Sequence, residues 1–124
     1  DLYGPKTLIG SSGTFETLSE IYQRKINEYA QEKDTELPIS QNGMLQILKE
    51  IIAKNKQERL LIPGMIELRV DMIVISSILI KFILKKTRLE TTRISSYAMK
   101  EGALLQIIKS QKIQKKHHKK NIDT

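Results

Sequence analysis

The sequence predicts an α/β fold that is mostly helical, with two short strands of a parallel or mixed sheet. Two segments with β-branched residues, 6–9 and 91–95, lie far apart in the chain. About 80 residues, whose apolar side chains have helical spacing, separate them. Strands separated in this way can be neighbours only in a parallel or mixed sheet. Because two strands form a meagre sheet, we expect further strands outside this chain.

The first predicted helix begins at Thr14 and ends near Lys33. Its apolar side chains recur at every third or fourth position and form one face, which comprises Phe15, Leu18, Ile21, Tyr22, Ile26, Tyr29 and Ala30. A polar loop is predicted at 32–38. After it, Ser40 is placed to cap a second helix, which ends around Asn55.

The third predicted helix, at about 66–86, follows the Pro63-Gly64 pair. Its second half is apolar nearly all round, so we expect neighbouring elements to cover it on several sides. The most apolar run, 72–84, contains Lys81 and is shorter than the roughly 20 residues that span a bilayer. A final helix is predicted from Met99 to Lys109.

Composition excludes several classes of site. The 124 residues fit one domain, and the absence of cysteine excludes disulfides, thiolate metal sites and thiol nucleophiles. The first residues show no targeting segment, and they resemble a cut inside a longer protein. A chain without cysteine fits a reducing compartment, so we expect a cytoplasmic location.

The positive charge is concentrated at the C-terminal end. The chain has a net charge of +7, of which residues 109–124 carry +5, from six lysines and one acid. We therefore predict a nearly neutral folded part at 1–108 and a basic flexible tail at 109–124. The tail has no aromatic residue on which bases could stack, which disfavours nucleic-acid binding. His117-His118 lacks a third ligand, so we predict no metal site there.

The turn GSSGT, which comprises Gly10, Ser11, Ser12, Gly13 and Thr14, is the main candidate binding site. A strand that runs through such a turn into a helix presents free backbone N–H groups and the positive end of the helix dipole to an anion. The alternative is a tight turn whose hydroxyls merely cap the helix. The turn matches neither GxxxxGK[ST] nor GxGxxG, because Thr14 and Ser12 stand where those motifs need lysine and glycine.

Four stretches in order resemble the Ppx/GppA family of exopolyphosphatases and guanosine pentaphosphate phosphatases. They cover about residues 7–108 and comprise the Gly10–Thr14 turn, Glu58-Arg59 with Ile62–Met65, Glu67–Ile73, and Thr92–Ser95 with Lys100–Leu105. The family usually has arginine at the position of Lys100 and a small Ala-Gly pair at the positions of Ser76 and Ser77.

The resemblance implies part of an RNase H-like domain of the actin-like ATPase superfamily, from the C-terminal portion of the second phosphatase domain. It also implies a parent hydrolase that uses Mg²⁺ and a first-domain glutamate to cleave a terminal phosphoanhydride of polyphosphate or guanosine pentaphosphate. In this reading Gly10–Thr14 forms one wall of the interdomain cleft. The catalytic glutamate and the metal ligands are expected upstream of Asp1, so we predict that this chain alone is inactive.

Three charged residues are further cleft candidates: Arg69, Lys100 and Glu101. The competing reading of Arg69 is an ion-pair or capping role beside Asp71, and that of Glu101 is a solvated acid at a helix start.

The alternative function is a catalytically inactive module that binds an alarmone or a nucleic acid. The expected partners are the polyphosphate or guanosine nucleotide and the upstream domain of the same protein. We also predict self-association through an exposed sheet edge, and no membrane association.

Overall fold

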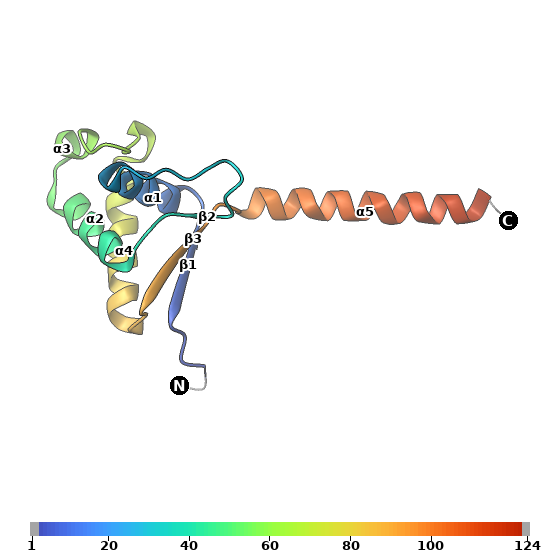
Figure 1. The fold of residues 1–124 in the computed structure, drawn as a ribbon, viewed down its shortest axis with the longest axis horizontal. Coiled ribbons are helices and arrows are strands. Elements are labelled where there is room, and N and C mark those ends of the chain that lie inside the picture. The colour runs from blue at the N-terminus through green and yellow to red at the C-terminus, as the bar shows by residue number, and fades with distance from the viewer. Residues whose placement is uncertain (1–2, 123–124) are drawn as a thin grey trace.

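The computed structural model describes residues 3–122, and their side chains as far as Lys112. Strands β1 (Thr7–Ser11), β3 (Thr91–Ser95) and β2 (Glu36–Leu37) form one sheet in that order. Helices α1 (Gly13–Ile26), α2 (Gln41–Ala53) and α4 (Met72–Thr87) pack beside the sheet, and α5 (Met99–Ile122) projects from this body (Figure 1). The short helices α3 (Lys56–Leu60) and η1 (Glu67–Arg69) lie in the connection between α2 and α4.

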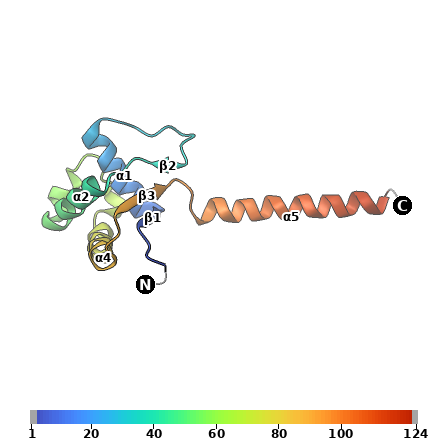
Figure 2. The ribbon, with the colours of Figure 1, turned by 60° about the horizontal axis from the view of Figure 1, so that its bottom comes forward.

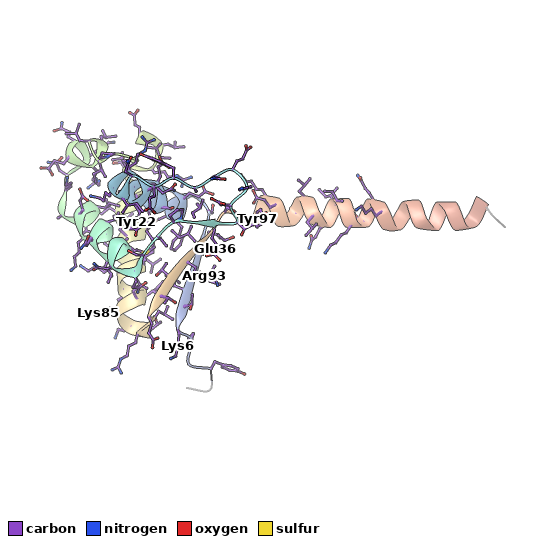
Figure 3. All side chains as sticks on the ribbon, in the orientation of Figure 1. Lys6, Tyr22, Glu36, Lys85, Arg93 and Tyr97 are labelled. Carbon is purple, nitrogen blue, oxygen red and sulfur yellow. The ribbon has the colours of Figure 1, made fainter. Side chains whose placement is uncertain are left out.

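The mixed sheet confirms the predicted fold class. Strands β1 and β3 are parallel, with Thr7 opposite Thr91 and Ser11 opposite Ser95. Strand β2 pairs antiparallel with β3 and lies in the segment predicted to be a polar loop. It has two residues, so no period-2 pattern could reveal it, and its pairing depends on β3. Glu36 forms an ion pair with Arg93 of β3 (Figure 3).

The core lies on one face of the sheet. Along β3 the side chains of Thr92 and Ile94 are buried, whereas Thr91 and Arg93 are exposed. The buried apolar cluster draws on all three long helices of the body and on β3; it comprises Leu18, Ile21, Met44, Ile47, Leu48, Ile51, Ile62, Ile73, Ile80, Leu84 and Ile94. The core face predicted for the first helix is therefore confirmed at Leu18 and Ile21, whereas Ile26 and Tyr29 at its predicted C-terminal end are exposed.

Helix α1 ends at Ile26, seven residues before the predicted end at Lys33. Asn27 adopts the left-handed conformation, with φ of 56°, which ends many helices. The Gln23 side chain then accepts a hydrogen bond of 2.6 Å from the Ala30 N–H. This contact holds the loop after α1 against the helix. The apolar residues of the loop therefore continue the spacing of the helix in the sequence, although Ala30 is not helical.

Helix α4 begins at Met72, later than the predicted start near residue 66, because residues 67–69 form a short 3₁₀ helix. The prediction that α4 is covered on several sides is wrong for this chain. Its inner face is buried at Ile73, Ser77, Ile80 and Leu84. Its outer face is at least half exposed, with exposed fractions of 52–65%, at Met72, Ile75, Ile78, Leu79 and Phe82.

Helix α5 continues to Ile122, beyond the predicted end at Lys109. Figure 2 shows it leaving the body as a single rod. The flexibility predicted for residues 109–124 stays a prediction, and the side chains of His117-His118 lie outside those described. Within residues 3–122, no helix has the length and apolarity that crossing a membrane requires.

Candidate functional site

The turn between β1 and α1 has an unusual backbone conformation at Ser12. This residue precedes the helix with φ of 68° and ψ of −175°. That region is populated almost entirely by glycine, and other residues held there store strain of about 1–3 kcal/mol. Its carbonyl accepts the Glu16 N–H at 3.0 Å, but its side chain makes no capping hydrogen bond.

The start of α1 therefore presents open backbone donors. The N–H groups of Gly13, Thr14 and Phe15 belong to the first turn, which has no intrahelical acceptors for them. The capping interpretation predicted that a hydroxyl of the turn would satisfy one of these groups, and Ser12, which occupies the N-cap position, does not. Together with the positive end of the helix dipole, these donors form a local environment suited to an anion.

Two glycines of the turn allow close side-chain contacts. A Cβ at Gly10 would collide with the ring of Phe15, and a Cβ at Gly13 would collide with the guanidinium of Arg69. Gly13 is buried within α1, so its missing side chain creates the space that the guanidinium occupies. The second contact thus brings a cation to the start of α1.

Arg69 reaches this place because the 61–70 segment passes close to α1. Gly64, with φ of 95°, lies so close to α1 that an added Cβ would be 2.8 Å from the Ile21 backbone nitrogen. The Arg69 N–H bonds to the Ile66 carbonyl at 3.0 Å, which forms the 3₁₀ turn, and the neighbouring Val70 is buried. The backbone of Arg69 is therefore fixed by the 3₁₀ turn before it and by the buried Val70 after it.

The Arg69 guanidinium has no carboxylate partner among the described residues. Asp71, its expected partner, instead pairs with Lys56 at 2.7 Å. A cation beside the positive end of a helix is electrostatically unfavourable, and the Glu16 carboxylate, which lines a hollow together with Arg69, does not form an ion pair with it. A bound anion would therefore relieve repulsion as well as accept hydrogen bonds.

Two hollows meet at the turn. One, of about 320 Å³, lies between the turn and α4 and is lined by Ser11–Phe15, Arg69, Ser76, Leu79 and Ile80. The other, of about 450 Å³, is lined by Ser11–Gly13, Glu16, Arg69 and Ala98–Lys100. Arg69 lines both hollows, and Lys100 brings a second cation to the larger one. The structure thus assembles the predicted turn, Arg69 and Lys100 at one place.

Glu101 is not among the residues that line either hollow. Its carboxylate accepts the Ala98 N–H at 2.7 Å, which caps the start of α5, and it lies 3.5 Å from the Lys100 ammonium. The Ala98 N–H is the main reason that the pKa of Glu101 is lowered. This geometry supports the helix-start interpretation of Glu101 over the cleft interpretation.

The described residues do not form a metal site of their own. No group of three His, Asp or Glu side chains within residues 3–112 is arranged to hold a metal ion. Glu16 contributes a carboxylate to the larger hollow. One carboxylate does not define a Mg²⁺ site by itself, because the ion takes its remaining ligands from water, from phosphate or from a second carboxylate.

Two polar residues at the site were not predicted from the sequence. Ser76 of α4 accepts a hydrogen bond of 3.4 Å from the Thr14 hydroxyl, and Glu16 follows the turn on α1. The position of Glu16, two residues after Thr14 on the predicted helix, could have indicated it. No local signal could have indicated Ser76, because its approach to Thr14 depends on how α4 packs.

Comparison with known proteins gives a family and a partial structural match. Residues 1–111 match the Ppx/GppA phosphatase family. Among solved structures, the chain is similar to an exopolyphosphatase from Cytophaga hutchinsonii ATCC 33406, with 38% sequence identity and a TM-score of 0.78. The similarity covers 88% of this chain but 35% of that one, so this chain spans about a third of the solved relative. No curated protein matches it.

Proposed function

The chain belongs to the Ppx/GppA phosphatase family, and from this premise we propose that it supplies one phosphate-binding wall of a phosphoanhydride hydrolase. In this proposal the parent protein releases terminal phosphate from inorganic polyphosphate or guanosine pentaphosphate. Residues 1–108 are the C-terminal portion of its second domain, and Gly10–Thr14 faces the cleft between domains.

The observation that carries the proposal is the Arg69 guanidinium against Gly13. Transfer of a phosphoryl group depends on positioning the phosphates and neutralising their charge. The open N–H groups at the start of α1 are suited to phosphate oxygens, and Arg69 supplies a planar fork of donors with a permanent charge. Lys100, 82% exposed, adds charge to the larger hollow without the bidentate geometry of arginine.

The catalytic chemistry belongs, in this proposal, to residues outside the chain. The water-activating glutamate and the Mg²⁺ ligands come from the upstream part of the parent protein, and the described carboxylates do not form a metal site. When bound, Mg²⁺ neutralises charge on the phosphates. The role of this chain is to hold phosphate oxygens with its turn and its two cations.

Titration of the purified chain with tripolyphosphate, followed by calorimetry, tests the proposal. We expect Arg69→Met to weaken binding at least tenfold, and Gly13→Ala to weaken it because the new Cβ displaces the guanidinium. Arg24→Met is the matched control, since Arg24 is exposed and pairs with Glu20 on α1. Equal affinities for the Arg69→Met and Arg24→Met variants would contradict the proposal.

The proposal also predicts that the chain alone has no hydrolase activity. Purified chain incubated with polyphosphate and Mg²⁺ should release no more phosphate than a blank. Phosphate release above the blank that survives repurification would show that the chain contains a catalytic group we have not identified.

A further inference from the structure

The outer face of α4 has the pattern of a helix that packs against another helix. Met72, Ile75, Leu79 and Phe82 follow each other at intervals of three, four and three residues, and each is more than half exposed. This spacing places them in one stripe about 15 Å long. Such a 3-4-3 stripe is the seam that a second helix fills with its own side chains.

Nothing in the described part of the chain covers this stripe. The contacts of α4 within the body are made by its opposite face, chiefly with α2, and its buried positions are those of that face. Exposed apolar patches of this kind on a folded protein mark interaction sites.

The charges beside the stripe define the partner further. Lys81, Lys85 and Lys86 are exposed on the C-terminal half of α4, and the Lys86 ammonium lies 5.9 Å from the centre of the Phe82 ring. Figure 3 shows Lys85 at the same end of the body as Lys6, away from Tyr97. A partner helix that reaches this end must carry carboxylates to complement these cations.

The stripe is continuous with the candidate site. Leu79 belongs to the stripe and also lines the hollow that contains Ser12, Thr14 and Arg69. A helix seated on α4 would therefore border this hollow at Leu79 and add a further wall to it. Water would be excluded from it, and the attraction between its cations and an anion would become stronger.

We infer that the stripe on α4 is the docking surface for an amphipathic helix with acidic flanks, contributed by the part of the parent protein outside this chain, and that its docking completes the phosphate site. The solved relative supports this choice of partner, because about two-thirds of that chain has no counterpart here. The second half of the inference rests on the proposed function, whereas the docking itself does not.

The test uses this chain and, as the probe, the polypeptide encoded immediately upstream in the same reading frame. Calorimetry should show one-to-one binding, weakened at least tenfold by Ile75→Glu and by Phe82→Glu. Leu61→Glu is the matched control, since Leu61 is 80% exposed and belongs to the end of α3 and not to α4. Lys85→Glu should weaken binding several-fold through loss of charge complementarity.

A second titration tests whether docking completes the phosphate site. The complex should bind tripolyphosphate about tenfold more tightly than this chain does alone.

Each outcome separates the two ideas. No binding, the absence of an upstream coding segment, or equal binding by the Ile75→Glu and Leu61→Glu variants would overturn the docking inference. A chain that forms only a homodimer, broken by Ile75→Glu, would also overturn it and assign the stripe to a second copy. Docking without tripolyphosphate binding, in either the chain or the complex, would leave the docking surface standing and reject the proposed function.

Discussion

Two kinds of helix start occur in this molecule. At α2 the Ser40 hydroxyl accepts the Gly43 N–H at 3.0 Å, and at α3 Asn55 and Glu58 cap each other's backbone N–H groups. At α1, Ser12 occupies the same place with an unfavourable φ and no capping bond. The start of α4 also lacks a capping bond from its own N-cap residue, but Asp71 has an ordinary φ of −85° there. The start beside Arg69 differs from all of these because it combines open donors with a backbone conformation that costs stability. This difference is the strongest structural sign of a binding site.

Ser12→Gly should give the largest change in stability. Glycine adopts φ of 68° without strain, so we expect unfolding free energy to rise by about 1–2 kcal/mol, measured by urea denaturation. Ser11→Gly is the control, because Ser11 lies in β1, where glycine weakens a strand by about 0.5–1 kcal/mol. If both variants lose stability, the conformation at Ser12 stores no strain in solution.

Removal of a hydroxyl should separate the two kinds of helix start. Ser40→Ala should cost about 1 kcal/mol of stability, because a capping bond is lost, and should not change tripolyphosphate binding. Ser12→Ala should leave stability within about 0.5 kcal/mol, since no capping bond exists there, and should weaken tripolyphosphate binding a few-fold. A loss of stability in Ser12→Ala equal to that in Ser40→Ala would show that Ser12 caps α1 after all.

The local features of the fold were predictable from the sequence. Ser40 was predicted as a cap and is one, and the strand at 91–95 has the predicted bounds, because both depend on residues close in the chain. Strand β2 was missed because it depends on pairing with β3, which is distant in the chain. The end of α1 was missed because the loop after Ile26 is held beside the helix by the Gln23 side chain and not by helical hydrogen bonds.

The candidate site was predictable in part for the same reason. The Gly10–Thr14 turn was found from its own composition, and the structure gives it the open donors that an anion site needs. For Arg69, the sequence also allowed an ion pair or a capping role beside Asp71 in place of a cleft role, because the two residues are close in the chain. Its actual neighbour, Gly13, lies 56 positions away and meets it only because Gly64 lets the intervening loop pass close to α1.

The start of α5 is a third capped start. Its cap is the carboxylate of Glu101, which accepts the Ala98 N–H and can be protonated at low pH. The Ala98 N–H, with a smaller effect of Lys100, lowers the pKa of Glu101 in the folded state. Its stabilising contribution is therefore present at neutral pH and is lost as the pH falls below the ordinary range near 4. An NMR titration of the Glu101 carboxyl should show the lowered pKa, most of which remains in Lys100→Met. Loss of the whole shift in that variant would assign it to the lysine.

Deletion of residues 110–124 should have the smallest effect on the site. Tripolyphosphate binding depends, in our proposal, on the start of α1 and on Arg69, and α5 projects away from the body that contains both (Figure 1). The deletion should therefore change tripolyphosphate affinity less than twofold. If the chain were instead a nucleic-acid-binding module, the same deletion would abolish binding to RNA or DNA that is strong at 50 mM salt and weak at 200 mM. Titration of the full and shortened chains with both ligands decides between the two functions, because a ligand held by the turn keeps its affinity after the deletion, whereas a ligand held by the lysines loses it.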